Sequence, residues 1–194
     1  MARRCKQCKA VELPPAAKCE SIIEKKGYCS VECLADHTKA KRIEAAIKKE
    51  RAAIRQAKER FKTRQEWIKD AQRWFNKWIR LRDAGQPCIS CGNTGGNDKG
   101  LGGHNYDAGH YRSVGASPEL RFEPDNCFKQ CVKCNRDMSG NVVNMRIEIL
   151  KRIGQERLDF IEGSHKPKKY TIDDLKEIKA KYKSLCYELE KNKT

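Results

Sequence analysis

The 194-residue chain carries 42 lysine and arginine side chains against 26 aspartate and glutamate side chains, and this formal net charge of +16 favours a polyanionic partner such as DNA or RNA over a membrane. Only 5 phenylalanines, 3 tryptophans and 3 methionines are present, so a single large hydrophobic core is not expected. No apolar run is long enough to cross a bilayer and the first residues lack the apolar stretch of a secretory signal, so we expect a cytosolic protein without membrane contact.

Residues 1–35 are predicted to form an N-terminal zinc module. Cys5 and Cys8 are separated by two residues, and Cys29 and Cys33 stand where a helix is expected to begin. Zinc takes four tetrahedral ligands, and a two-residue gap lets one turn present two sulfurs to one ion. Paired thiols in a reducing compartment indicate zinc rather than disulfides, so we expect a structural zinc site here. A redox-active dithiol is the alternative.

Residues 36–84 are predicted to be a long basic helical region. The first helix extends to Lys62, because the stretch contains strong helix formers and neither glycine nor proline. A capping box at Thr63 then starts a second helix, which ends at Asp83. Between residues 38 and 82 there are 16 basic and 5 acidic side chains, a net charge of +11, which favours contact with phosphates. In the first helix the predicted DNA-binding residues are Lys48, Lys49, Arg51, Arg55, Lys58 and Arg60.

A narrow apolar stripe follows the first of these helices. Its members recur at helical spacing and are Ile43, Ile47, Ile54, Ala57 and Phe61. Such a stripe can be the seam between two helices of a homodimer, or it can pack against other parts of the same subunit. The sequence leaves both arrangements open.

Residues 85–163 are predicted to be a zinc-stapled domain of short strands and loops. Two further close pairs have the spacing of a four-cysteine zinc site, namely Cys88 with Cys91 and Cys131 with Cys134. Zinc bound by four thiolates has no open coordination position, so this site is structural. The chemistry must therefore come from residues held beside the cysteine pairs.

The C-terminal third is predicted to be helical. Apolar residues recur at helical spacing from Val142 until Gly154 ends the helix, and a short helix then extends to Gly163. Residues 164–194 are expected to contain a basic linker and a last amphipathic helix, which is capped at Thr171.

Three residues beside the second zinc site resemble the signature of the HNH, or ββα-metal, nucleases. In that family a histidine precedes a loop, an asparagine lies shortly before the second cysteine pair, and a histidine or asparagine follows it directly. His110, Asn126 and Asn135 occupy these positions. The resemblance implies that His110 is the general base, that Asn126 braces the loop and that Asn135 binds a catalytic Mg²⁺ or Mn²⁺. Histidine suits the first role because its unperturbed pKa lies near neutrality.

The position directly before the proposed base departs from the family pattern. Many family members carry an acidic residue or a histidine directly before the base, but Gly109 stands at that position. The nearest carboxylate is Asp107, and we predict that a β-bulge at Gly109 lets it reach the metal. Alternatively Asp107 caps the turn, or His104 is the ligand or base. Arg112 is predicted to contact DNA.

Several motifs, in order, resemble the NinG/Rap family of lambdoid phage recombination nucleases. They are Trp67-Ile-Lys, Cys88-Ile-Ser-Cys-Gly, Asp107-Ala-Gly-His-Tyr-Arg, Leu120-Arg-Phe, Lys129-Gln-Cys-Val-Lys-Cys-Asn and Ser139-Gly-Asn. The resemblance implies a metal-dependent endonuclease of branched DNA, such as Holliday junctions and D-loops, that acts as a homodimer in the host cytoplasm. Its fold would be α+β, with an HNH core, an N-terminal zinc module and long basic helices.

Two other functions remain open from the sequence. A sequence-specific HNH nuclease of the restriction or homing kind would cut linear duplex DNA at a fixed site. A zinc-finger protein that binds nucleic acid without cutting it would use the HNH-like residues only as scaffold.

Overall fold

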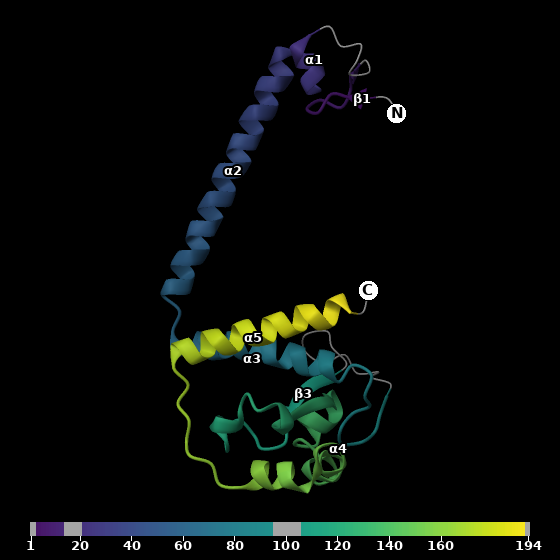
Figure 1. Cartoon of the computed structure of the whole chain (residues 1–194), viewed down its shortest axis with the longest axis vertical. Coiled ribbons are helices and arrows are strands. Elements are labelled where there is room, and N and C mark those ends of the chain that lie inside the picture. The colour runs from purple at the N-terminus through teal and green to yellow at the C-terminus, as the bar shows by residue number, and fades with distance from the viewer. Residues whose placement is uncertain (1–2, 14–20, 95–105, 193–194) are drawn as a thin grey trace. The chain divides into compact units, whose positions relative to one another are not determined.

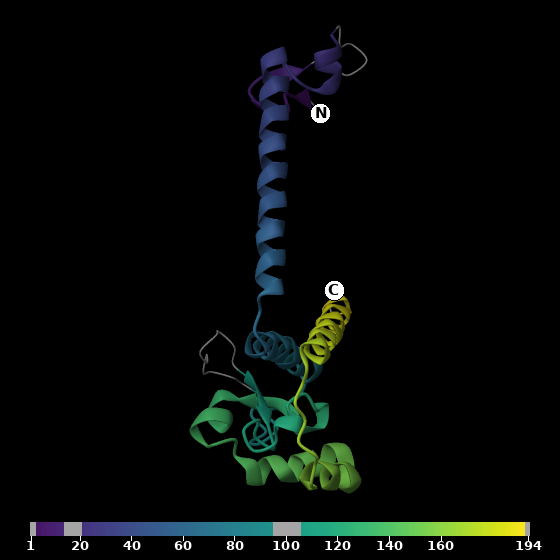
Figure 2. The same cartoon turned by 90° about the vertical axis from the view of Figure 1, so that its left-hand side faces the viewer.

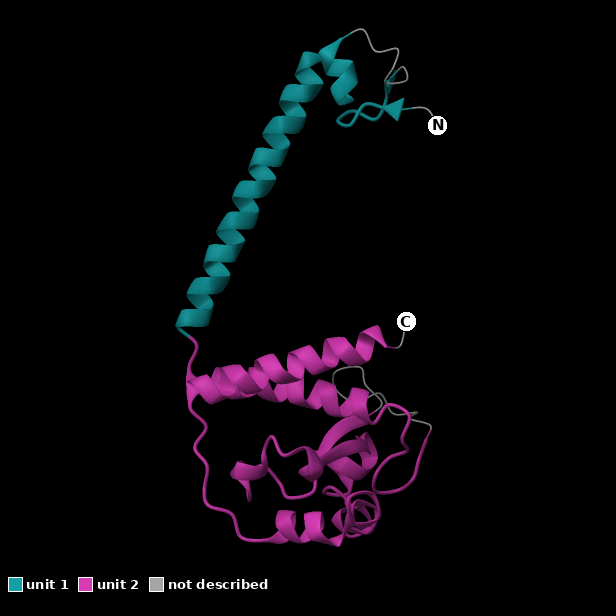
Figure 3. Ribbon diagram, viewed as in Figure 1, with its two compact units in different colours: residues 1–61 teal, residues 62–194 magenta. Residues whose placement is uncertain are grey.

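The computed structural model describes residues 3–13, 21–94 and 106–192. The chain divides into two compact units, of which unit 1 covers residues 1–61 and unit 2 covers residues 62–194 (Figure 3). The division falls between the two predicted basic helices, so each unit contains one of them. In the described ranges, no helix combines the length and the apolar character needed to cross a bilayer.

Unit 1 begins with a small hairpin and a short helix (Figure 1). Strand β1 (Arg3–Arg4) pairs antiparallel with β2 (Glu12–Leu13). Helix α1 (Ile22–Lys26) starts at a capping box formed by Ser21 and ends at Gly27. The φ of Gly27 is 91°, a conformation that lacks a steric penalty only for glycine.

Helix α2 (Val31–Arg60) makes up the rest of unit 1. It begins between Cys29 and Cys33, where the sequence predicts the start of a helix, and the Ser30 hydroxyl caps it by accepting a hydrogen bond from the Cys33 amide at 3.2 Å. No residue of α2 is buried. The apolar stripe is exposed, with 51% of Ile43, 42% of Ile47 and 49% of Ile54 accessible to solvent, so the stripe is not packed inside unit 1.

Two amphipathic helices of unit 2 lie side by side (Figures 1 and 2). They are α3 (Arg64–Arg82) and α5 (Ile172–Lys191), and both begin at the predicted capping boxes, which Thr63 and Thr171 form. Phe75 and Tyr182 pack edge to face between them, with ring centroids 4.9 Å apart. Their interface is the larger part of the core of unit 2.

A two-stranded hairpin lies next to this helix pair. Strand β3 (Tyr106–His110) pairs antiparallel with β4 (Cys127–Cys131) without interruption. One face of the hairpin packs against α3 through Ala108 and Cys127. The other face carries Phe128, which packs against the next helix. The mixture of helices with small sheets confirms the α+β class.

That next helix is α4 (Val142–Glu162), whose Met145 and Ile149 cover Phe128. Gly154 has non-helical torsions, with φ of 79°, and divides α4 into a longer and a shorter segment, as predicted. A single π-helical turn, η4 (Lys133–Asp137), connects β4 to α4. The hairpin is therefore held between helices on both faces, and η4 lies at its cysteine-bearing end.

Candidate functional site

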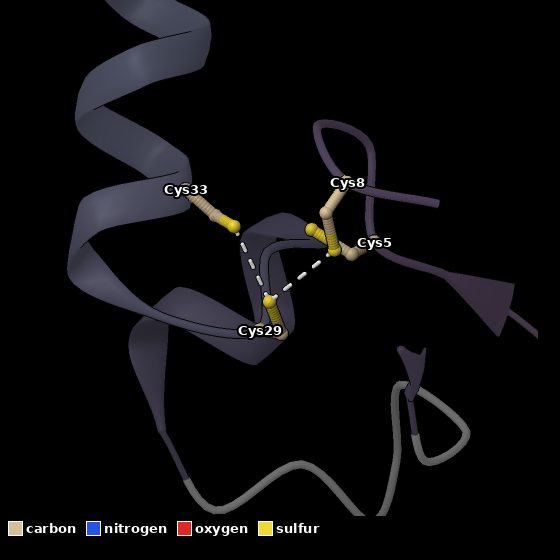
Figure 4. A group of neighbouring side chains, drawn as sticks. All are labelled: Cys5, Cys8, Cys29 and Cys33. Carbon is tan, nitrogen blue, oxygen red and sulfur yellow. Dashed lines mark hydrogen bonds between the residues drawn. The ribbon is translucent and has the colours of Figure 1, made fainter. Parts of the chain in front are cut away.

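The four cysteines of unit 1 come together as predicted (Figure 4). The loop between β1 and β2 carries Cys5 and Cys8, the segment before α2 carries Cys29, and the first turn of α2 carries Cys33. Their four sulfur atoms lie within 4.8 Å of one another, and Cys8 Sγ is 3.7 Å from Cys29 Sγ. Zinc–sulfur bonds of about 2.3 Å place tetrahedral sulfurs about 3.8 Å apart, so this cluster fits zinc.

The cysteines of the second predicted site also form a tetrad within 4.8 Å, consisting of Cys88, Cys91, Cys131 and Cys134. Cys91 Sγ lies 3.8 Å from Cys131 Sγ. Burial would raise the pKa of the Cys88 thiol, but backbone hydrogen bonds, including one from the Cys131 amide at 3.2 Å, outweigh burial and lower it. Burial raises the pKa of the Cys91 and Cys131 thiols, so Cys88 is more readily a thiolate than either of these two before a metal binds. No described cysteine forms a disulfide.

The second tetrad fixes the position of Asn135. Cys131 ends β4, and Cys134 lies in η4 directly before Asn135. Asn135 Nδ2 donates a hydrogen bond to Asp107 Oδ2 on β3 at 3.0 Å. Two residues that lie 28 positions apart in the sequence therefore meet beside the second cysteine tetrad.

Asp107 is the centre of this group. Its side chain is 16% exposed, and Arg136 binds it with both ends of the guanidinium, Nε to Oδ2 at 2.8 Å and Nη2 to Oδ1 at 3.0 Å. Burial would raise the pKa of the Asp107 carboxyl, but the hydrogen bonds from Arg136 and Asn135 outweigh burial and hold it below its usual value. The carboxylate is therefore charged at neutral pH.

Two side chains of this group carry oxygen atoms of the type that divalent cations bind. A carboxylate oxygen and an amide oxygen are ligands that Mg²⁺ and Mn²⁺ accept, and Mg²⁺ commonly takes only one or two carboxylates and completes its shell with water and phosphate. Asn135 presents its amide nitrogen to Asp107, so its Oδ1 becomes a second ligand only when the amide turns over. As the side chains lie, Arg136 and Asn135 donate to both oxygens of Asp107, so a cation would have to share the carboxylate with these donors or displace them.

His110 lies on the opposite face of the hairpin from Asp107. Side chains alternate along a regular strand, and β3 and β4 pair in register through both residues. His110 Nε2 donates a hydrogen bond to the Arg121 carbonyl at 2.9 Å, so the lone pair is on Nδ1, which lies 3.7 Å from Cys127 Sγ. The structure does not bring His110 to Asp107 and Asn135.

The environment of His110 keeps its imidazole neutral. Burial against Phe75, whose ring centroid is 6.0 Å away, lowers the pKa of His110. The hydrogen bond to the Arg121 carbonyl opposes this effect only in part. A neutral imidazole retains the lone pair that a general base needs, although here it points toward Cys127.

Asn126 is fully buried and holds the loop that follows β3. Its Oδ1 accepts a hydrogen bond from the Arg112 amide at 2.8 Å, and its Nδ2 donates to the Arg112 and Leu120 carbonyls at 3.0 and 3.2 Å. All of these partners are backbone atoms. Asn126 therefore braces the loop and does not contact Asp107 or Asn135.

The predicted β-bulge at Gly109 is wrong. Gly109 pairs with Phe128 in an unbroken antiparallel register, so Asp107 reaches Asn135 from a regular strand. Glycine is required at position 109 for a different reason. A Cβ at this position would lie 2.1 Å from Gln130 Oε1, so only glycine leaves room for the Gln130 amide.

The remaining predicted residues are placed as follows. His104 falls outside the described residues. Arg112 donates from Nη1 to the Glu162 carbonyl at the end of α4, at 3.1 Å. All six predicted DNA-binding residues of α2 are exposed: Lys48, Lys49, Arg51, Arg55, Lys58 and Arg60.

Sequence reasoning missed two residues near Asp107. Arg136 directly follows Asn135 in the sequence. Its position next to a proposed metal ligand could have marked it as a candidate site residue. Gln130 gave no signal, because only the strand register shows that it lies opposite Asp107.

Comparison with known proteins identifies the family. The family model described as "Bacteriophage Lambda NinG protein" matches residues 1–192. The chain is 44% identical over 119 residues to protein ninG of Escherichia phage lambda, a match covering 61% of this chain and 55% of that protein. It is 48% identical over 105 residues to protein ninG of Enterobacteria phage H19B, covering 54% of this chain and 49% of that protein.

The chain spans about half the length of the curated relatives that it matches. No solved structure matches it. The family model nevertheless covers almost the whole sequence, from the first cysteine pair to the last helix. The chain therefore belongs to the NinG family of bacteriophage lambda.

Proposed function

We propose that this protein is a metal-dependent, structure-selective endonuclease that hydrolyses phosphodiester bonds in branched recombination intermediates such as Holliday junctions and D-loops. The observation that carries the proposal is the meeting of Asp107 and Asn135 beside a closed cysteine tetrad. A charged carboxylate and an amide held together by a structural zinc site form a small site for a hard cation. The net charge of +16 supplies the attraction for DNA.

Each residue has a defined part in this proposal. Asp107 and Asn135 hold the cation, and Asn126 fixes the loop after β3. When bound, Mg²⁺ or Mn²⁺ supplies charge stabilisation for the phosphate and for the leaving 3′ oxygen. His110 enters as general base through the resemblance alone, because its Nδ1 faces Cys127.

Two zinc ions per chain and DNA contacts along α2 complete the proposal. Zinc in the tetrads holds the loops that carry the other residues, as structural zinc does. The exposed basic side chains of α2 bind phosphates without reading sequence, which suits a nuclease that selects the shape of DNA. Pairing of two chains along the exposed stripe would present two sites to one junction.

The test is cleavage of linear, flapped and four-way DNA with and without Mg²⁺ or Mn²⁺. Asp107→Asn should lower the rate of cleavage at least a hundredfold while zinc content stays unchanged, since it deletes the charged ligand. Asp70→Asn is the matched control, because Asp70 is also ion-paired and 21% exposed but lies on α3 near Lys62 and Lys179.

The alternatives give different results in the same assay. A fixed cut in linear duplex would indicate a sequence-specific HNH nuclease. Binding of all substrates without any metal-dependent cleavage would indicate a zinc-finger DNA-binding protein and would refute the endonuclease.

A further inference from the structure

Both carboxylate oxygens of Asp107 already accept hydrogen bonds. Arg136 donates one hydrogen bond to each carboxylate oxygen. Asn135 donates the third hydrogen bond of the carboxylate, to Oδ2. These donors use three of the about four lone-pair sites of the carboxylate, and a divalent cation bound there would lie next to the positive guanidinium of Arg136. A guanidinium and a divalent cation therefore compete for this carboxylate.

Arg136 is suited to leaving this position. Its side chain is 36% exposed and projects from the single turn η4, so water can replace its contacts. An arginine guanidinium is charged at all physiological pH values, so the side chain remains a cation after it is displaced. Water reaches the Arg136 side of this ion pair, and such screening weakens an ion pair.

We propose that Arg136 occupies the cation position at Asp107 in the metal-free protein and, once displaced, binds the phosphate that is to be cleaved. This inference rests on the proposed function, because it concerns the same site. A displaced guanidinium is free to bind another anion, and the DNA phosphate is the anion that the proposed reaction brings to Asp107. The planar guanidinium matches two phosphate oxygens as well as it matches a carboxylate.

The proposal predicts opposite effects of one substitution on two measurements. Arg136→Gln removes the competitor, so the affinity of Asp107 for a cation should rise. The same change removes the phosphate ligand, so the rate of cleavage should fall. A side chain that only stabilised the fold would lower both.

A second pair in unit 2 provides a matched control. Arg146 binds Glu162 in the same bidentate way, with distances of 2.7 and 3.0 Å, and the Tyr111 hydroxyl adds a third donor to that carboxylate. Arg146→Gln therefore frees a carboxylate from equivalent contacts, away from Asn135. This variant tests whether any carboxylate that loses its arginine partner binds a cation, wherever it lies in unit 2.

The experiment titrates zinc-loaded, DNA-free protein with Mn²⁺ and follows free Mn²⁺ by its electron paramagnetic resonance signal. Arg136→Gln should lower the dissociation constant for Mn²⁺ about two- to fivefold, the factor that corresponds to loss of an exposed ion pair. Asp107→Asn should abolish this binding, and Arg146→Gln should leave it unchanged. Zinc content and tryptophan fluorescence verify that each variant is folded.

Single-turnover cleavage of a four-way junction at saturating Mn²⁺ completes the test. Arg136→Gln should cleave roughly ten- to a hundredfold more slowly than the native protein, and Arg136→Lys should recover part of the rate. Unchanged or weaker Mn²⁺ binding in Arg136→Gln would overturn the competition. Tighter binding with an undiminished rate would overturn the phosphate contact. Failure of the native protein to cut any DNA would instead refute the proposed function, and the Mn²⁺ titration would still decide the competition.

Discussion

Gln130 fills the space that a side chain at position 109 would occupy. Gln130 is fully buried, and its Nε2 donates to Ser90 Oγ and to the Gly140 carbonyl. A methyl group on Gly109 would meet Gln130 Oε1 at 2.1 Å and force the amide out of these bonds. Gly109→Ala should therefore lower the free energy of unfolding of unit 2 by about 1–3 kcal/mol, as measured by urea denaturation.

A second glycine controls for the substitution itself. Nothing lies within 4 Å of a Cβ placed on Gly115, so Gly115→Ala should leave the urea midpoint nearly unchanged. Equal midpoints for the two variants would show that Gln130 moves aside without cost.

His110 should make the stability of unit 2 depend on pH. Burial lowers the pKa of His110 in the folded state, whereas the unfolded chain has a pKa near 6.5. Below about pH 6.5 the unfolded state binds a proton before the folded state does, so stability is full above this pH and is lost as pH falls. His110→Gln should reduce the loss of stability between pH 7.5 and 5.5, measured from urea midpoints.

Tryptophan fluorescence suits this measurement, because all 3 tryptophans lie in α3 of unit 2. His37→Gln, a change in unit 1, serves as the control for the loss of a histidine. If His110→Gln loses as much stability on acidification as the native protein, another group causes the pH dependence.

At the level of elements, the helices of unit 2 follow from the sequence because their signals are local. Thr63 and Thr171 accept hydrogen bonds from backbone amides three residues later, and these contacts depend only on neighbouring residues. Gly154 interrupts α4 for a reason that is also local, because its backbone has a positive φ, which glycine adopts readily. The start of α2 beside Cys29 and Cys33 is also a local signal, because the Ser30 hydroxyl caps the helix by accepting a hydrogen bond from the Cys33 amide.

The hairpin and its candidate site depend on contacts between distant residues, and the sequence predicted them only in part. Spacing predicted the two cysteine tetrads, motif resemblance predicted a role for Asn135, and Asp107 was predicted as the carboxylate nearest to the base. The strand register decides which side chains share a face, and it separates His110 from Asp107. The contact between Arg136 and Asp107 spans 29 residues and has no local signature.

For the whole molecule, the two units should lose their structure separately when zinc ligands are removed. Each unit contains one complete cysteine tetrad. Cys29→Ala should lower zinc content from two ions to one without changing the urea midpoint seen by tryptophan fluorescence. Cys88→Ala should also leave one zinc but should shift that midpoint strongly, because zinc binding contributes to folding in small zinc domains.

Cys186→Ala is the control for these changes. Cys186 is buried between α5 and α3 and belongs to neither tetrad, so this variant should retain two zinc ions. Elemental analysis gives the zinc content of each variant. Loss of both ions from Cys29→Ala would show that the units depend on each other.

The exposed stripe of α2 makes a last prediction about assembly. A helix of 30 residues without a buried side chain leaves Ile43, Ile47 and Ile54 in water, and a second copy of the same stripe would cover them as a two-helix seam. Replacing these three residues with aspartate should convert a dimer to a monomer in sedimentation, because three charges would face three charges across the seam. The monomer should cut a four-way junction by single nicks rather than by paired cuts. Aspartate at Ala45, Ala53 and Gln56 adds the same three negative charges to α2 outside the stripe and should leave the dimer intact. A stripe variant that still sediments as a dimer and makes paired cuts would place the contact between subunits elsewhere.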